Sequence, residues 1–213
     1  DGAGQPRWIE YSHQGLLANT YQLAAVLDLG PADTIFCAPS LAGYDGLLLG
    51  MVAPLALGIG QFHFSSAMAR AQCAGVYDSN ATVVFGDDDF LLALAQAAHR
   101  YDMARIRRVL AVGERLGERT CQLWRQKLGH EVYWLYGGAR TGIISANTPM
   151  HKRPGTRGKL LPGVRLRPAD PNAAGKNGGA QIYSPGMALG EACAQALSVA
   201  NDGFVSMEPM AEE

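Results

Sequence analysis

The chain has 213 residues, of which 48% are hydrophobic and 17% charged, and its net charge at neutral pH is -1. This composition supports a buried core in one large or two small domains and excludes a disordered chain. The near-neutral balance argues against a nucleic-acid-binding surface or a polybasic membrane patch, so neither is expected as a partner.

The four cysteines are scattered, with no Cys-x-x-Cys pair. Because structural metal sites need clustered ligands, we expect no metal site built on them. Isolated thiols are typical of a reducing compartment and the N-terminus does not resemble a signal peptide, which together predict a cytoplasmic protein. The longest apolar stretch, residues 47–59, is interrupted by Gly and Pro and is too short to span a bilayer.

Helical and strand patterns alternate along the first two thirds of the chain. In order, they predict a helix (19–29), a strand (33–38), a helix (46–57), a strand (81–85), a helix (87–98), a strand (106–112), a helix (114–128) and a strand (131–136). Asp87, Asp88 and Asp89 suit the N-cap and first turn of the helix predicted at 87–98. Gly129 suits the position that ends the helix predicted at 114–128. Such alternation predicts a mostly parallel sheet with crossover helices.

The pattern changes after Tyr136. Short β-like runs separated by Pro and Gly follow, at residues 142–145, 159–161, 164–167 and 180–183. They predict a small antiparallel barrel or meander. We therefore expect an α/β subdomain over 1–140 and a small β-rich subdomain over 141–213, with a loop at 168–179 and a frayed tail at 208–213.

Five phrases of the sequence resemble the adenylate-forming acyl-activating (AMP-binding) superfamily, and most of all the acyl-ACP synthetase domain of 2-acylglycerophosphoethanolamine acyltransferases. They are GQPRWIEYSHQGLLAN (4–19), ATVVFGDDDFL (81–91), YDMARIRRVLAVGERLGERTCQLWRQKLG (101–129), WLYGG (134–138) and NTPMHKRPGTRGKLLPGVRLR (147–167). The resemblance implies part of the N-terminal domain of such an enzyme. The matched phrases correspond neither to the family's first α/β subdomain nor to its mobile C-terminal domain.

The family's phosphate loop is Ser/Thr/Gly-rich and ends in Pro-Lys-Gly. The matching stretch here runs from Gly2 to Trp8 and has lost its hydroxyl residues, although Gly4 and Arg7 are retained as candidate nucleotide-binding residues. Arg7 keeps a positive charge, but Trp8 replaces a glycine where a phosphate must approach the backbone. Two interpretations remain: a weakened anion site, or an N-terminal arm that packs Trp8 against the core.

Three further motifs supply candidate site residues. The position at which relatives place an aromatic or histidine beside the acyl pocket falls on Ala42 or Gly43, with one residue inserted. Tyr44, which follows, could line such a pocket or simply cap a core helix. Gly113 and Glu114 match the family's adenine-binding turn, although Glu114 also suits the first turn of a helix. Tyr136 and Gly137 match the start of the family's Tyr-Gly-x-Thr-Glu motif.

The last position of that motif departs from the family. The resemblance implies a Mg²⁺-binding glutamate there, but the chain has Arg140. A guanidinium cannot coordinate Mg²⁺ and repels it, so Mg²⁺ is not expected and any binding of ATP or AMP should be weak. Arg140 could instead bind a phosphate or carboxylate, or form a surface ion pair. The family's ribose-binding aspartate likewise falls on Pro209, one residue after Glu208.

These departures predict a truncated, acyl-CoA or acyl-ACP synthetase-like pseudoenzyme that acts as a binding or scaffold partner in an acyl-transfer or biosynthetic pathway. The alternative is an acyl-activating ligase or acyltransferase that needs a partner chain, with Arg140, Tyr44 and Glu114 as the catalytic candidates. Because intact relatives cover this unit with another subdomain, we expect an exposed apolar face. That face would support a homodimer or a heteromer, with an acyl carrier protein or a pathway enzyme as possible partners.

Overall fold

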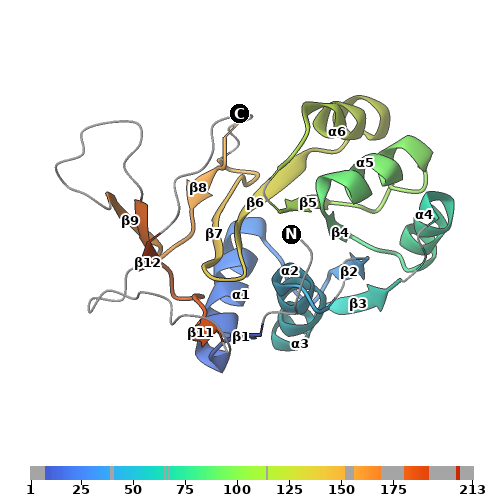
Figure 1. Cartoon of the computed structure of the whole chain (residues 1–213). Coiled ribbons are helices and arrows are strands. Elements are labelled where there is room, and N and C mark those ends of the chain that lie inside the picture. Colours follow the sequence, from blue (N-terminus) through green and yellow to red (C-terminus); the bar gives the residue numbers. More distant parts are fainter. Residues whose placement is uncertain are drawn as a thin grey trace.

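The large sheet has seven strands in the order β3-β2-β4-β5-β6-β7-β8 (Figure 1). The computed structural model describes residues 8–38, 41–64, 66, 68–113, 115–151, 156–168, 180–191 and 205–206. The sheet has five parallel strands, β3 (Gly60–His63), β2 (Thr34–Cys37), β4 (Val83–Gly86), β5 (Arg108–Val112) and β6 (Val132–Gly138), followed by antiparallel β7 (Gly142–Ala146) and β8 (Lys159–Leu160). The mostly parallel sheet predicted from the sequence is confirmed.

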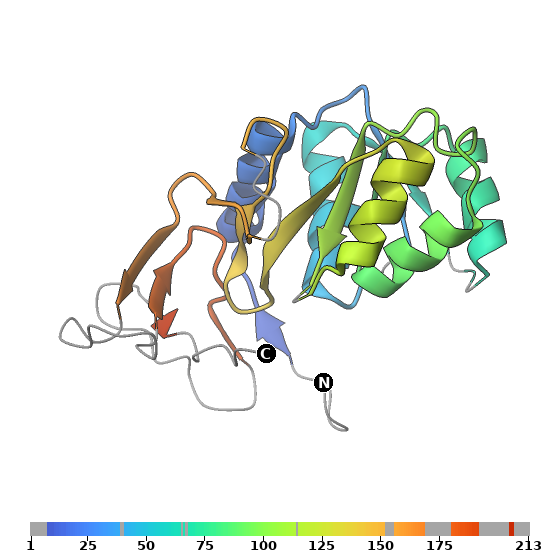
Figure 2. The same cartoon turned by 90° about the horizontal axis from the view of Figure 1, so that it is seen from above.

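Helices cover both faces of this sheet, as the view from above shows (Figure 2). One face packs against α1 (His13–Leu27), α2 (Tyr44–Leu47), η1 (Leu48–Val52) and α3 (Ala53–Leu57), and the other against α4 (Ala69–Asp78), α5 (Asp88–Ala97), α6 (Glu118–Leu123) and η2 (Trp124–Leu128). Successive strand residues point to opposite faces, so Ile35 and Cys37 join one buried cluster while Phe36 joins the other. Strands buried on both faces are apolar throughout for this reason.

The predicted helix boundaries follow from local chemistry. Asp87 caps α5 by accepting a hydrogen bond from the Phe90 amide at 2.8 Å, and Gly129 ends η2 at φ 82°. The helix predicted from residue 114 begins only at Glu118. The apolar helix predicted over 46–57 is a continuous helical run in which one segment, η1, has π-type hydrogen bonding. The sequence reading missed β3, α4 and the short strand β1 (Ile9–Glu10).

The β-rich part is divided between sheets. Strands β7 and β8 extend the large sheet, and the 140/141 boundary lies in the turn that joins β6 to β7. A separate three-stranded antiparallel sheet consists of β9 (Arg165–Pro168), β10 (Ala180–Tyr183) and β12 (Val205–Ser206), and β1 pairs with β11 (Gly190–Glu191). The described strands thus confirm a small antiparallel sheet, which is open rather than a closed barrel. Of the loop predicted at 168–179, Pro168 is the last residue of β9, and the rest lies outside the described residues, as does the tail at 208–213.

Asn19 of α1 joins the helices to the β6–β7 hairpin. Its buried amide oxygen accepts hydrogen bonds from the Tyr44 hydroxyl at 2.7 Å and the Ile143 amide at 2.9 Å. Its amide nitrogen donates to the Ile143 carbonyl at 2.8 Å and to the Gln22 side chain at 2.9 Å. The whole hydrogen-bonding capacity of the side chain is therefore used in the core.

We predict that Asn19→Ala destabilises the protein by about 3 kcal/mol, because it leaves the buried Ile143 amide and carbonyl and the Tyr44 hydroxyl without their partner. Tyr44→Phe, which removes only one of these bonds, should cost about 1 kcal/mol. Urea unfolding followed by circular dichroism measures both. Equal losses for the two variants would show that Asn19 does not hold the hairpin.

Candidate functional site

The parallel strands bring their carboxyl ends to one edge of the large sheet. After β2 the chain forms β3, which lies on one side of β2. It then forms β4 on the other side of β2 and continues outward through β5 and β6. The direction of winding therefore reverses between β2 and β4. In open α/β sheets, ligands bind outside the carboxyl ends of the strands near such a reversal, so the candidate site is expected here.

Gly113 and Tyr136 lie together at this edge. Val112, the last residue of β5, is the register partner of Leu135 on β6, so the residues that follow are neighbours. The Trp134 indole N–H donates a hydrogen bond to the Gly113 carbonyl at 3.0 Å and fastens the two strand ends. The structure thus brings together residues of two predicted nucleotide-binding motifs, the adenine turn of Gly113 and the Tyr-Gly motif of Tyr136.

Gly137 is required by the β6–β7 hairpin. A Cβ atom at this position would lie 2.1 Å from the Gly142 carbonyl oxygen, far inside the normal contact distance. The register between β6 and β7 also shifts at Tyr136 and Gly137. Close packing of the two strands therefore explains this glycine without a ligand.

The ring of Tyr136 is flanked by other side chains. The guanidinium carbon of Arg157 lies 4.6 Å from its centroid, and the Trp134 ring meets it edge-on at 6.2 Å. Cation–π contact of this kind holds a guanidinium over an aromatic face. A base that stacked on that face would have to displace Arg157.

Arg140 lies in the exposed turn between β6 and β7, and its carbonyl accepts a hydrogen bond from the Ala188 amide at 3.0 Å. The side chain has donors only, whereas Mg²⁺ takes oxygen ligands, so this turn does not fit the metal. Across the part of the chain that the structure describes, no three His, Cys, Asp or Glu residues gather as a metal-binding group.

Tyr44 is buried beside Tyr11. Their ring centroids are 5.1 Å apart, and the Tyr11 hydroxyl donates a hydrogen bond to the Ala139 carbonyl at 2.5 Å. Burial, with the nearby Asp45 charge, raises the pKa of Tyr11 well above its usual value, and the same effects raise that of Tyr44. Both phenols stay protonated at neutral pH, and the Tyr44 hydroxyl is engaged with Asn19.

Asp45 is a residue that the sequence reading left without a role. It follows Tyr44 in the first turn of α2, at the same strand-end edge, and burial raises its pKa from 3.8 to about 6. Its carboxyl group can therefore gain or lose a proton near physiological pH. A single carboxylate inside the apolar run of residues 44–57 was the signal that could have identified it.

A groove of about 550 Å³ lies between α6 and β6. Its lining combines apolar side chains with charged and amide side chains. The lining residues are Leu116, Glu118, Cys121, Gln122, Arg125, Gln126, Glu131, Val132, Trp134, Asn147 and Thr156. Through Trp134 the groove is continuous with the strand ends that carry Gly113. Gly4, Arg7 and Glu114, the other predicted nucleotide-binding residues, lie outside the described residues, as does Glu208.

The doubly wound sheet and its strand-end edge are those of an α/β ligand-binding protein. The chain belongs to the AMP-binding enzyme family, whose model matches residues 3–190. This confirms the family resemblance found in the sequence.

Among known proteins, the chain is similar to the acetyl-coenzyme A synthetase of Bacillus subtilis (strain 168), with 27% identity over 184 residues, covering 78% of this chain and 30% of that protein. Among solved structures, it resembles apo MatB from Rhodopseudomonas palustris, with a TM-score of 0.82, 24% identity and coverage of 97% of this chain and 43% of that one. The anthranilate CoA ligase AuaEII in complex with anthranoyl-AMP has a TM-score of 0.82 at 20% identity, with coverage of 96% and 42%. The chain thus spans less than half of each of these relatives. No helix among its described residues is long and apolar enough to cross a membrane.

We predict that Asp45→Asn removes a pH dependence of stability. Because the folded-state pKa of Asp45 is raised, burial of the charged form destabilises the protein at neutral pH, and this penalty disappears as the pH falls from about 6 towards 4. The variant should gain on the order of 2 kcal/mol over the wild type at pH 7 and nothing at pH 4. Urea unfolding across this range measures the difference, with Asp78→Asn, an exposed carboxylate of α4, as the control. A pH-independent difference would contradict the assignment.

Proposed function

We propose that the protein is a non-catalytic member of the AMP-binding family that acts as a binding or scaffold partner in acyl metabolism. The observation that carries this proposal is Arg140, a cation at the position where the family motif has its metal-binding glutamate. Adenylation needs charge neutralisation at the transferred phosphate, and a preorganised metal is the usual means. Without that carboxylate, the strand-end site is not equipped for the step.

The surroundings of Tyr136 support the same proposal. Arg157 covers the ring at 4.6 Å, and Trp134 ties β6 to Gly113. A cation thus lies over the aromatic ring, an arrangement that favours an anionic ligand over a metal-bound nucleotide. An acyl carboxylate or a phosphate ester is the ligand class that this chemistry suits.

A second candidate function is an acyl-activating ligase whose site is completed by another polypeptide. The paired strand ends at Gly113 and Tyr136 favour it, because they retain the position of the family's adenine turn. In this case a partner chain would supply the carboxylate that Arg140 replaces. Acyl transfer at the strand-end site, with Tyr44 and Glu114 as participants, is a variant of the same candidate.

Two measurements separate the candidates. Isothermal titration calorimetry with ATP and Mg²⁺ tests nucleotide binding, and pyrophosphate exchange with a panel of fatty and aryl acids tests adenylation. We expect no exchange above the no-enzyme background. Exchange by the protein alone would overturn the scaffold proposal, and exchange that appears only with a second chain would establish the ligase.

The variant Arg140→Glu restores the family's carboxylate. We predict that it makes nucleotide binding depend on Mg²⁺, strengthening the affinity for ATP roughly tenfold when the metal is added, because one charge-assisted contact is worth about 1.5–3 kcal/mol. Arg140→Gln removes the cation without supplying a metal ligand and is the matched control. Identical titrations for the two variants, with and without Mg²⁺, would show that position 140 is not the former metal site.

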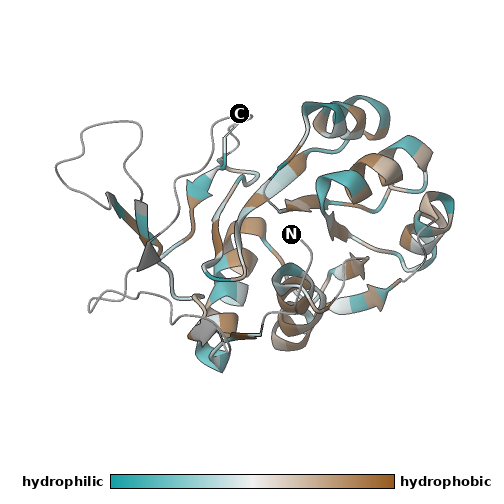
Figure 3. Ribbon diagram, in the orientation of Figure 1, coloured by the Kyte–Doolittle hydropathy of each residue, from teal (hydrophilic) through white to brown (hydrophobic). Residues whose placement is uncertain are grey.

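The partner proposal rests on exposed apolar side chains of the helices over one sheet face. They lie on α1, η1 and α3, which contact one another, and the ribbon of η1 and α3 is largely hydrophobic (Figure 3). These side chains, with their exposed fractions, are Leu17 (38%), Tyr21 (55%), Met51 (43%) and Leu55 (68%). An apolar group of this kind marks an association surface, and a homodimer or a stable heteromer would cover it.

We predict that the purified chain self-associates through this face. Size-exclusion chromatography with light scattering should show a dimer that Tyr21→Ser with Leu55→Ser dissociates. The control, Tyr77→Ser with Tyr101→Ser, changes two exposed tyrosines elsewhere and should leave the mass unchanged. A monodisperse monomer at all concentrations would contradict the prediction.

A further inference from the structure

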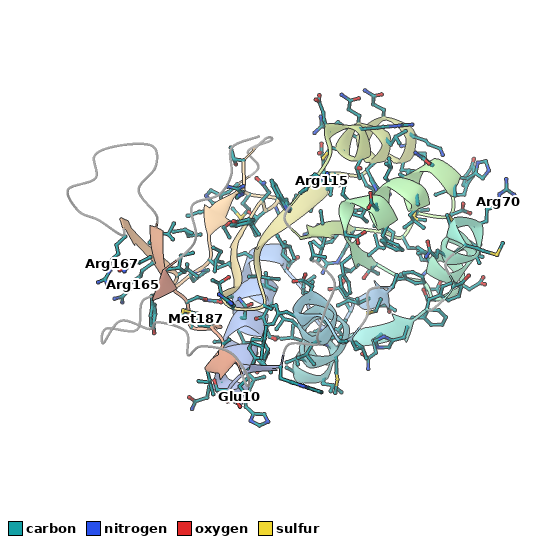
Figure 4. The ribbon with its side chains drawn as sticks, in the orientation of Figure 1. Glu10, Arg70, Arg115, Arg165, Arg167 and Met187 are labelled. Carbon is teal, nitrogen blue, oxygen red and sulfur yellow. The ribbon has the colours of Figure 1, made fainter. Side chains whose placement is uncertain are left out.

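Strand β3 leaves one edge of the large sheet open. It stands first in the strand order, so among the described strands it pairs only with β2, and all four of its residues, Gly60–His63, are exposed (Figure 1). Edge strands are usually protected by charged side chains, by Pro or by a covering element. Residues 46–69 contain no Asp, Glu, Lys or Arg, and Arg70, the next charged residue, lies on α4 well apart from β3 in Figure 4. No charged side chain of this segment therefore keeps a second strand away.

The backbone groups of two residues face outward at this edge. The Phe64 amide donates a hydrogen bond to the Cys37 carbonyl of β2 at 3.1 Å, and the Gly60 amide donates to the residue before β2 at 2.9 Å. Because alternate residues of a parallel strand bond to the same neighbour, the amide and carbonyl groups of Gln61 and His63 point away from β2. Within the described part of the chain, no backbone group bonds to them. The edge thus offers donors and acceptors that another strand can use.

These outward groups are self-complementary. In an antiparallel pair, directly opposed hydrogen-bonded residues exchange both of their N–H···O bonds. When Gln61 of one copy lies opposite His63 of a second copy, a two-fold axis also places His63 opposite Gln61, and every outward group of both strands finds a partner. The axis then passes between Phe62 and its mate. That is a non-hydrogen-bonded position, where opposed side chains lie closest to each other.

The side chains of β3 fit the same register. Phe62 is the register partner of Phe36, and its ring centroid lies 6.1 Å from that of Phe36 and 6.2 Å from that of Phe64. Phe62 is still 38% exposed, so the Phe62 ring of a second copy can extend this row of aromatic rings. On the other face of the strand, the Gln61 amide oxygen lies 3.2 Å from the His63 Nε2, and both side chains would meet the same two polar side chains of the second copy. Apolar thus meets apolar, and polar meets polar.

The strand pairing alone is too small for a stable dimer, which buries about 800 Å² on each partner. Strand β3 contacts η1, which carries the exposed Met51, and the exposed Leu55 lies on α3, which follows η1. Extending the sheet across a two-fold axis brings the helices that flank its edge strands towards each other. The apolar face of α1, η1 and α3 is therefore continuous with the β3 edge, and one dimer can bury both.

We propose that a second copy of the chain pairs its β3 with this β3, antiparallel and about a two-fold axis at Phe62, so that the two large sheets become one. This inference rests on the proposed self-association through α1, η1 and α3, and it names the central contact of that dimer. It commits to a closed dimer, because such a contact uses the same surface on both copies. A dimer held by the helices alone would not need the backbone of Gln61 and His63.

Charge swaps at the axis test the register. Phe62→Lys and Phe62→Glu each place two like charges opposite each other and remove the aromatic pair, so each variant should dimerise at least about tenfold more weakly than the wild type in sedimentation equilibrium. An equimolar mixture of the two variants should recover a heterodimer, since opposite charges then face each other. Tyr101→Lys, the same change at an aromatic residue that is 85% exposed, is the control and should leave the mass unchanged. Failure of the mixture to recover a dimer would overturn the register.

His63→Pro tests the backbone bonds. It removes an outward amide N–H and leaves the bonds to β2 in place, and an edge strand tolerates Pro at such a position. The variant should dimerise at least about tenfold more weakly, because the symmetric contact loses one hydrogen bond on each side of the axis. His63→Ala keeps the amide and is the matched control, with an expected change of less than about threefold. Thermal unfolding of each variant confirms that it is folded.

The outcomes separate this inference from the association on which it rests. A wild type that is monomeric at all concentrations would contradict both. A dimer that Tyr21→Ser with Leu55→Ser dissociates, but that the variants at Phe62 and His63 leave intact, would overturn the β3 pairing alone and leave the edge to another extended segment. Neither result bears on whether the strand-end site catalyses a reaction.

Discussion

The arrangement of the strand-end site depends on one buried amide, that of Asn19. It bridges α1, the first turn of α2 and the start of β7, and each of its four hydrogen bonds joins it to a buried residue. In a low-dielectric core, such a network is far more costly to break than to keep, so it holds one geometry. The β6–β7 turn is fixed as a result, and with it the position of Arg140. Two glycines pack closely against Asn19. A Cβ atom on Gly142 would lie 3.1 Å from the Asn19 amide oxygen, and a Cβ atom on Gly186 would lie 2.8 Å from the Asn19 Cβ.

The electrostatics of the site differ from what a metal-dependent reaction requires. The guanidinium of Arg157 lies over the ring of Tyr136, whereas the half-buried carboxyl group of Asp45 lies beside Tyr11 and Tyr44. The edge of the sheet is therefore positive on the β6 side and carries a titratable acid on the α2 side. A family scaffold with this charge pattern is better suited to hold an anion than to activate a nucleotide, and the fold alone does not decide between those uses.

The sequence allowed the parallel sheet to be predicted because its strands are short apolar runs bounded by Gly, Asn and Asp, and because Asp87 and Gly129 mark helix ends through local hydrogen bonds and φ angles. Strand β3 escaped detection because its residues, Gly60–His63, are all exposed and show no apolar alternation. The assignment of β7 and β8 to the large sheet depends on long-range pairing that no local pattern encodes. At the site, the family resemblance named Gly113 and Tyr136 as nucleotide-binding candidates, but their proximity and contacts such as Arg157 with Tyr136 arise only from strand pairing and tertiary packing.

The three tryptophans occupy three distinct environments: Trp8 is 70% exposed, Trp124 is fully buried, and Trp134 is partly buried with its indole N–H bonded to Gly113. Indole emission shifts with solvent contact and hydrogen bonding, so the protein carries an intrinsic optical reporter at the junction of β5 and β6. Any ligand that separates these strand ends, or that displaces the guanidinium next to Tyr136, changes the surroundings of that fluorophore. Binding at the strand-end site can thus be followed without a label.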